Sequence, residues 1–159
     1  GNMSSRLFNE VREKRGLAYA IASHVKMLKD GGVFYVHAGI DRKNFSEAAR
    51  VILAEARRLK AKGVTGDELR RAKEYLTAQA QMAMDDAMEH MLAVGEALMN
   101  TGTVLTKEEV RRRIERVTAS DVLRVARRFL VGPSMRLAAV GPRLGKEEAA
   151  IQKAVNAFE

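Results

Sequence analysis

The sequence predicts an α+β fold, in which helices are layered on one face of a small antiparallel sheet. Two apolar runs, residues 17–28 and 32–41, flank the turn sequence Lys29-Asp-Gly-Gly32, and this combination is typical of a β-hairpin. Asp-Gly favours such a turn because it readily adopts the positive φ that tight hairpins need. Amphipathic stretches with capping signals occupy most of the remaining chain, so we expect more helices than strands.

The first element is a short amphipathic helix. Its apolar residues recur at spacings of three and four, and they are Met3, Leu7, Val11 and, nearby, Phe8. Ser4 and Ser5 offer hydroxyls for its N-cap, and Gly16 ends it. Leu17 then opens the first extended run, so the chain turns from helix to strand within a few residues.

A second helix is predicted after the hairpin. Asn44 or Ser46 caps its start, and Gly63 ends it. Its expected apolar face comprises Phe45, Ala48, Ala49, Ile52, Ala56 and Leu59. Arginine and lysine residues occupy the other side, as they do on a helix that has one face in water.

Capping boxes mark the starts of two further helices. In a capping box, two residues three positions apart each accept, with a side-chain hydroxyl or carboxylate, a hydrogen bond from the free backbone amide of the other. Thr65-Gly-Asp-Glu68 begins a long helix whose apolar residues are Leu69, Ala72, Leu76, Ala80 and Ala83. Whether that helix continues through Gly95, kinks there or breaks is left open. Thr106-Lys-Glu-Glu109 begins a shorter helix.

Three elements complete the predicted order. Thr118 or Ser120 starts a helix that Gly132-Pro133 stops, and its expected inner residues are Val122, Val125, Ala126 and Phe129. Residues 135–140 form a short apolar strand. Residues 146–158 form a last amphipathic helix, whose apolar residues are Ile151, Ala154, Val155 and Phe158.

Arg12 and Tyr19 flank the predicted corner between the first helix and the first strand. Both side chains donate hydrogen bonds, and the guanidinium of Arg12 is permanently charged. The two donors can therefore converge on one carbonyl or carboxylate group. The alternative is that Arg12 pairs with Glu10 or Glu13 at the surface while Tyr19 simply packs.

The opening residues closely resemble a known family motif. They read Gly1-Asn-Met-Ser-Ser-Arg-Leu-Phe-Asn-Glu-Val-Arg12-Glu-Lys-Arg-Gly16-Leu-Ala-Tyr19. This string is similar to the start of the C-terminal half in the pitrilysin/insulinase/mitochondrial processing peptidase family of zinc metallopeptidases, the inverzincins. Weaker similarity continues through Ala-Gly-Ile-Asp41, Gly63-Val-Thr, residues 98–102 and Val-Gly-Pro142. The resemblance implies that residues 1–159 are a single, partial C-terminal domain that lacks its first strands.

The resemblance also implies roles for Arg12 and Tyr19. In the family, the arginine and tyrosine at these motif positions reach from the C-terminal half to an active site whose zinc lies in the N-terminal half. Arg12 and Tyr19 would accordingly contact the substrate and its transition state, where donors lower the barrier by meeting developing negative charge. Arg6 and Arg15 are weaker candidates, and Arg6 is expected to brace the helix.

The family's zinc motif, His-x-x-Glu-His, is absent from this chain. The nearest string, Asp86-Ala-Met-Glu89-His90, has Asp where the first His would stand. Aspartate can bind zinc, but a catalytic zinc needs three protein ligands and a water, and nothing in the sequence brings His24 or His37 to His90. We therefore favour a polar helix face, expect no metal ligand or cofactor site here, and expect the chain alone to be inactive.

Five methionines crowd the same region, and they are Met82, Met84, Met88, Met91 and Met99. Flexible thioethers suit an adaptable peptide-binding wall, but filling of a core is the commoner role.

Composition narrows the function classes further. Lys and Arg number 28 against 20 Asp and Glu, a net charge of +8, but the basic residues alternate with acidic ones and only Arg111-Arg-Arg113 forms a run. We therefore expect no nucleic-acid binding. The absence of cysteine excludes disulfides and cysteine-bound zinc. No apolar run approaches the ~20 residues of a membrane span, and for the compartment we take the cytoplasm as the default expectation.

The sequence thus predicts the C-terminal substrate-binding portion of a zinc-dependent metalloendopeptidase. Its expected partners are a peptide substrate, an N-terminal half or separate zinc-bearing subunit, and a second copy joined through an unpaired sheet edge. The alternative function is a non-catalytic structural or partner subunit of the same family. A pure scaffold has no chemical reason to keep both Arg12 and Tyr19.

Overall fold

The computed structural model describes residues 3–141 and 145–158 and divides into two compact units. The first unit takes its described residues from 1–24, 35–63 and 122–159, and the second consists of 25–34 and 64–121. Gly1, Asn2 and Pro142, which belong to the family resemblance, lie outside the described residues.

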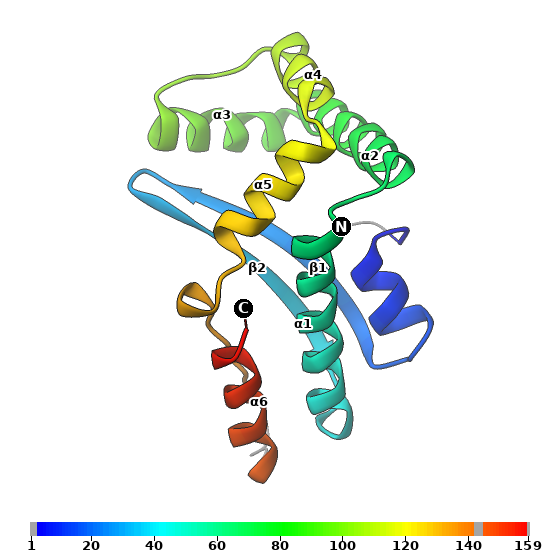
Figure 1. Ribbon diagram of the computed structural model, residues 1–159. Helices are drawn as coiled ribbons and strands as arrows, with labels where there is room; N and C mark the ends of the chain where they lie inside the picture. The colour runs from blue at the N-terminus through cyan, green and yellow to red at the C-terminus, as the bar shows by residue number, and fades with distance from the viewer. Residues whose placement is uncertain (1–2, 142–144, 159) are drawn as a thin grey trace. The chain divides into compact units, whose positions relative to one another are not determined.

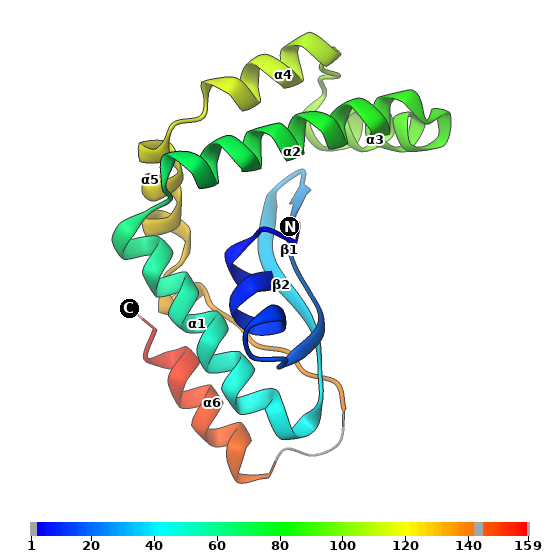
Figure 2. The same ribbon diagram turned by 90° about the vertical axis from the view of Figure 1, so that its right-hand side faces the viewer.

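Figures 1 and 2 show the elements along the chain. In order they are η1 (Phe8–Glu13), β1 (Ala18–Leu28), β2 (Gly31–Ile40), η2 (Arg42–Asn44), α1 (Phe45–Lys62), α2 (Gly66–Asp85), α3 (Ala87–Thr101), α4 (Lys107–Arg116), α5 (Ala119–Phe129), η3 (Gly132–Ser134) and α6 (Lys146–Asn156). The predicted α+β class is confirmed, because helices accompany a single antiparallel hairpin within the described residues. No described helix combines the length and the apolar content that crossing a bilayer requires.

The hairpin forms where the sequence predicts it, but its turn works differently from the expectation. Only Lys29 and Asp30 separate the strands, and none of residues 29–32 has a positive φ. Gly32 is needed for space instead. A Cβ on Gly32 would lie 2.9 Å from the carbonyl oxygen of Lys26 in the facing strand, which is closer than two such atoms can approach.

The first unit holds two apolar clusters. The first cluster joins η1 and α1 to the base of the hairpin, and its buried residues are Val11, Leu17, Ala18, Ile21 and Ala48. Val11 has no exposed surface, so it anchors η1 in this cluster. Burial of these apolar side chains fixes the helix-to-strand corner in place.

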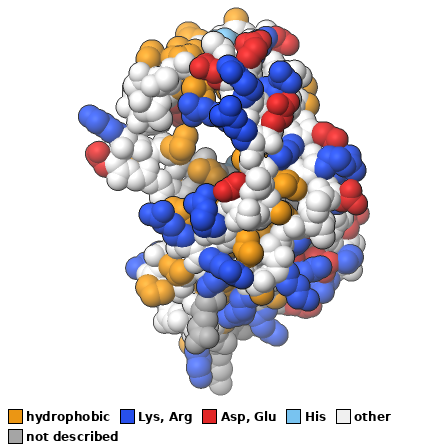
Figure 3. Space-filling view, turned by 45° about the horizontal axis from the view of Figure 1, so that its top comes forward, with side chains coloured by type: hydrophobic (Ala, Val, Ile, Leu, Met, Phe, Trp, Pro, Cys, Tyr) orange, Lys and Arg blue, Asp and Glu red, His pale blue; other side chains and the backbone are white. Residues whose placement is uncertain are grey.

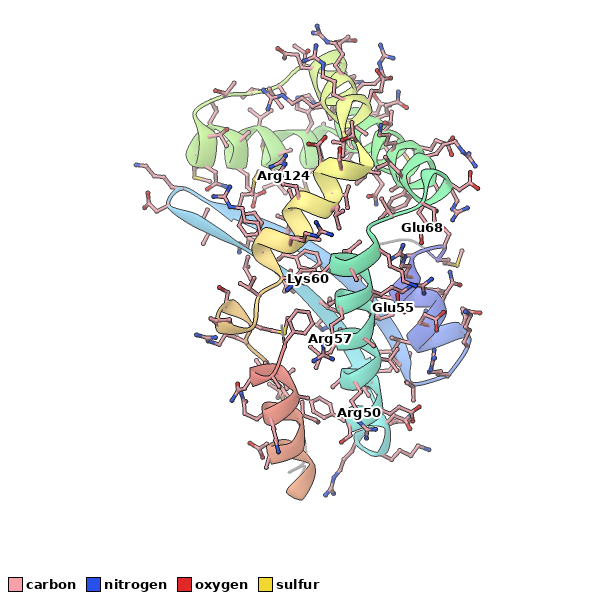
Figure 4. The ribbon with its side chains drawn as sticks, in the orientation of Figure 1. Arg50, Glu55, Arg57, Lys60, Glu68 and Arg124 are labelled. Carbon is pink, nitrogen blue, oxygen red and sulfur yellow. The ribbon has the colours of Figure 1, made fainter. Side chains whose placement is uncertain are left out.

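The second cluster joins α1 to α6, which lie side by side in Figures 1 and 2. Its buried residues are Leu53, Ile151, Val155 and Phe158. Ile151 and Val155 confirm the predicted apolar face of the final helix, whereas Phe158 lies beyond the end of α6 at Asn156. Arg57 and Lys60, labelled in Figure 4, lie over the ring of Phe158 at 5.0 and 5.5 Å from its centroid. α1 therefore buries residues on two faces, one toward each cluster.

The second unit is built from α2, α3 and α4, and here the capping signals are confirmed. Thr65 and Glu68 cap α2 reciprocally, and Thr106 and Glu109 do the same for α4. The long helix breaks at Asp86 rather than at Gly95, and α3 continues through Gly95. Asp86 accounts for the break, because its carboxylate accepts hydrogen bonds from the first free amides of α3.

Three sequence-based expectations are wrong. Residues 135–140 form no strand, since no described segment pairs with them. Val125 and Phe129 of α5 are exposed rather than inside, and Ala126 is the buried residue of that helix. The methionines of α2 and α3 do not fill a core, since neither helix buries any of its described residues. The exposed ones are Met82, Met88, Met91 and Met99.

Candidate functional site

The corner between η1 and β1 carries the candidate site. η1 is a π-helix, in which the amide of Lys14 donates to the carbonyl oxygen of Asn9 at 2.9 Å. Gly16 then takes φ +60°, and its amide donates to the carbonyl oxygen of Arg12 at 2.9 Å. A π-turn is wider than an α-turn and is frequent at functional sites. It changes the direction in which the last residues of the helix leave its axis.

Arg12 projects from this last turn with an exposed side chain. Its guanidinium carbon lies 4.9 Å above the centroid of the Phe8 ring, which is within the range of a cation–π interaction. Among residues 3–141 and 145–158, Arg12 has neither a hydrogen-bond partner nor an ion-pair partner for its side chain. Its donors are therefore open to a group from outside the described chain.

Glu10 does not pair with Arg12, which removes one part of the alternative interpretation. Lys14 and Arg15 bind the two oxygens of the Glu10 carboxylate, each at 2.5 Å. These hydrogen bonds, the one from Lys14 first and the one from Arg15 second, lower the pKa of Glu10 from 4.5 to about 2. Arg15 is thus committed to Glu10 and is a poor candidate for a substrate contact.

Tyr19 lies on the outer surface of β1 with 76% of its area exposed. Ala18 and Ile21 are both buried although three positions separate them, so the in-and-out alternation of the strand shifts between them. The phenol lies over Gly39 of β2: a Cβ on Gly39 would come within 2.5 Å of the Tyr19 hydroxyl oxygen. Tyr19 therefore packs on backbone with one ring face and leaves the other in solvent.

The structure brings both donors to the surface of one unit, at either side of the same corner. A guanidinium and a phenol hydroxyl can hold a peptide carbonyl or stabilise negative charge on it. That Arg12 and Tyr19 act on one substrate stays a prediction. The packing of Tyr19 on Gly39 is a feature that sequence reasoning missed, because the two residues are distant in the chain.

Arg6 makes a structural contact with the end of α1, which the sequence did not predict. Its Nη2 donates to the carbonyl oxygen of Gly63 at 2.9 Å, and Gly63 ends α1 with φ +66°. This bond ties the start of the chain to the end of α1 within the first unit.

The residues of the zinc near-miss have other partners. The Oδ1 of Asp86 accepts hydrogen bonds from the amides of Met88 and Glu89, both at 2.9 Å, and the Nδ1 of His90 lies 3.2 Å from the carbonyl oxygen of Met84. In the first unit, the ring of His24 stacks on that of Tyr35 at 5.2 Å. The described part of the chain holds no group of three His, Cys, Asp or Glu side chains placed to bind a metal ion.

The basic surplus is distributed among acidic side chains. Arg111 pairs with Glu115 at 2.9 Å and Arg70 with Glu74 at 3.1 Å, in each case four residues along the same helix. On the face drawn in Figure 3, red acidic groups likewise lie among the blue basic ones. This mixture of acidic and basic side chains is typical of helix faces exposed to water rather than of a continuous basic surface.

A cavity of about 120 Å³ lies between α2 and α4 in the second unit. Its lining residues are Thr77, Ala80, Gln81, Met84, Lys107, Glu108, Val110, Arg111 and Ile114. In the described part of the chain, no side-chain hydrogen bond joins two of these residues into the acid–base or nucleophile–base pair that a catalytic site contains. The corner between η1 and β1 therefore stays the candidate site.

The sequence comparisons match this chain to a peptidase domain family and to zinc proteases. The family model described as "Peptidase M16 inactive domain" matches residues 1–76. An uncharacterized zinc protease from Streptomyces coelicolor is 34% identical over 155 residues, which is 98% of this chain and 34% of that protein. The chain thus spans about a third of the length of the curated relatives that it matches.

Two solved structures share the fold. A peptidase M16 inactive domain from Pseudomonas fluorescens has a TM-score of 0.67 and 22% identity, and the match covers 80% of this chain and 30% of that one. A chain of complex III2 from Candida albicans has a TM-score of 0.71 and 19% identity, with 79% of this chain and 30% of that one covered.

Proposed function

The chain belongs to the peptidase M16 family, in which it corresponds to the inactive domain, and we propose that it is the substrate-binding portion of a zinc-dependent endopeptidase. The observation that carries this proposal is the pair of exposed donors, Arg12 and Tyr19, at one helix-to-strand corner. A zinc-bearing N-terminal half, joined in the same protein or supplied by a partner subunit, would complete the active site.

The zinc ion is not assigned to this chain, because its described residues offer no set of ligands that fits one. Zinc bound in the other half would supply an activated water for attack on the peptide carbonyl. The contribution of this chain is to bind and orient the peptide. The planar fork of Arg12 offers several donors, and the stiff phenol of Tyr19 offers one with little entropy to lose.

The transition state of peptide hydrolysis gives these donors their catalytic value. Negative charge develops on the carbonyl oxygen as water adds, and a donor that meets this charge stabilises the transition state more than the substrate. Arg12 is suited to this task because it has no competing acidic partner among the described residues. Phe8 holds it from below without neutralising its charge.

The test is reconstitution with a zinc-bearing half. We expect this chain alone to show no peptide hydrolysis, and the assembled enzyme to show hydrolysis that a chelator abolishes. Arg12→Ala and Tyr19→Phe should each lower kcat about 10- to 10³-fold in the assembly. Arg15→Ala and Tyr35→Phe are matched controls, since Arg15 is bound to Glu10 and Tyr35 is stacked on His24.

Full activity of both Arg12→Ala and Tyr19→Phe would contradict the proposal and favour the alternative, a non-catalytic partner subunit. Chelator-sensitive hydrolysis by this chain alone would contradict it as well.

Self-association is a separate part of the proposal. Each strand of the hairpin has one edge without a partner strand in the described residues, and Val33 and Phe34 near its turn are about half exposed. Exposed edges of this kind pair readily with other strands. Sedimentation at increasing concentration should show a rising mass, and a constant monomer mass would contradict this part.

A further inference from the structure

Among the glycines of β2, Gly39 is the one at which a new side chain would contact the candidate site. A Cβ added there would lie 2.5 Å from both the hydroxyl oxygen and Cε1 of Tyr19, and closer still to Cζ. Gly31, in the same strand, has nothing within 4 Å of such a Cβ. The three heavy atoms nearest to such a Cβ on Gly39 all belong to the phenol of Tyr19.

The backbone of Gly39 does not itself require glycine. Its φ is not in the left-handed region, so an alanine would meet no conformational strain there. Glycine is needed here because the Tyr19 ring comes so close to the strand. Contact of an aromatic ring with a cross-strand glycine is a known way to cover exposed backbone and to fix the ring.

We infer that Gly39 is a positioning residue for Tyr19, and that it sets the height and direction of the phenol hydroxyl relative to a bound peptide. This inference rests on the proposed function of Tyr19. A ring lying flat on backbone has fewer rotamers open to it than a freely exposed ring, so its hydroxyl is held before the substrate arrives. A methyl group at position 39 would lift the ring away from this place.

The substitution is expected to spare the fold. The atoms that a new Cβ would meet are at the far end of a side chain that is 76% exposed, so the ring can move without disturbing the core. The cost therefore falls on the position of the hydroxyl. A displacement of about 1 Å in a catalytic group can lower a rate about 10²-fold.

Nuclear magnetic resonance of this chain tests the contact itself. The Hα protons of Gly39 lie under the Tyr19 ring and should be shifted upfield by its ring current. We expect the upfield shift to disappear in Tyr19→Leu. Equal Gly39 Hα shifts in the wild type and Tyr19→Leu would overturn the inference, whatever the activity of any variant.

A double-mutant cycle in the assembled enzyme tests the function of the contact. Gly39→Ala should lower kcat about 10²-fold when Tyr19 is present, and should change it little when Tyr19→Phe has already removed the hydroxyl. Gly31→Ala is the control that should leave kcat unchanged in both backgrounds, and thermal unfolding checks that each variant is folded.

Two outcomes of the cycle overturn the inference. The first is an equal loss from Gly39→Ala in both backgrounds, which indicates a structural role. The second is no loss in either background. If Tyr19→Phe alone keeps wild-type kcat, the proposed role of Tyr19 fails, and this result is distinct from a failure of Gly39 to act through Tyr19.

Discussion

The Nη2 of Arg6 donates a hydrogen bond of 2.9 Å to the carbonyl oxygen of Gly63, 57 positions further along the chain. Gly63 ends α1 with a positive φ, so its carbonyl points away from the helix and needs a partner. The segment that carries Arg12 is thus tied to the longest helix of the first unit by one charged donor.

Replacing this donor should destabilise the protein. We expect Arg6→Ala to lower the free energy of unfolding by about 1–3 kcal/mol, because a partly buried carbonyl loses a charged partner. Arg70→Ala is the matched control, since Arg70 makes only exposed ion pairs and its replacement should cost less stability than Arg6→Ala. Urea denaturation measures both, and equal losses would contradict this role for Arg6.

Glu10 should make stability depend on pH in the acid range. Hydrogen bonds from Lys14 and Arg15 lower its pKa from 4.5 to about 2 in the folded chain. The carboxylate therefore stabilises the fold above about pH 4.5, and this contribution is lost as the pH falls toward about 2. Glu10→Gln removes the contribution at every pH.

The difference in urea midpoint between the wild type and Glu10→Gln should accordingly be largest near neutral pH and shrink on acidification. A difference that stays constant from about pH 7 down to about pH 2 would show that the ion pairs of Glu10 do not lower its pKa.

Asp86 should behave as a helix cap and not as a metal ligand. Its carboxylate accepts two amide hydrogen bonds at the start of α3, so Asp86→Ala should cost about 1 kcal/mol of stability. Asp86→Asn should retain most of it, because Asn caps as well as Asp does. Thermal unfolding with and without zinc measures the difference, and a zinc-dependent stabilisation lost in Asp86→Asn would favour a metal site.

The hairpin turn offers a test of close packing. Gly32→Ala should destabilise the protein by about 1–3 kcal/mol, since its Cβ would meet the Lys26 carbonyl oxygen at 2.9 Å and backbone cannot move aside cheaply. Gly31→Ala, one residue earlier and in open space, should be nearly neutral. Equal urea midpoints for the two variants would mean that the strands do not approach as closely as the structure has them.

Local signals in the sequence predicted much of this fold. The hairpin and both capping boxes depend on residues within a few positions of one another, so they can be predicted without knowledge of tertiary contacts. The strand expected at 135–140 failed for the opposite reason. A strand needs a partner, and none of the described residues supplies one there.

Part of the candidate site could likewise be predicted from the sequence, and part of it could not. Arg12 and Tyr19 were found from a motif, and their exposure agrees with a role outside the core. The contact of Tyr19 with Gly39 crosses between strands, and the π-helical end of η1 depends on a hydrogen bond that spacings of three and four do not encode. Neither feature has a local sequence signal.

The central claim is that Arg12 and Tyr19 stabilise the transition state of peptide hydrolysis. Its most direct test is the affinity of a tetrahedral phosphinic peptide, which mimics that state, for the assembled enzyme. Arg12→Ala and Tyr19→Phe should weaken inhibition by about the same factor, 10- to 10³-fold, by which they lower kcat/KM. Wild-type inhibition constants in both variants would contradict the claim.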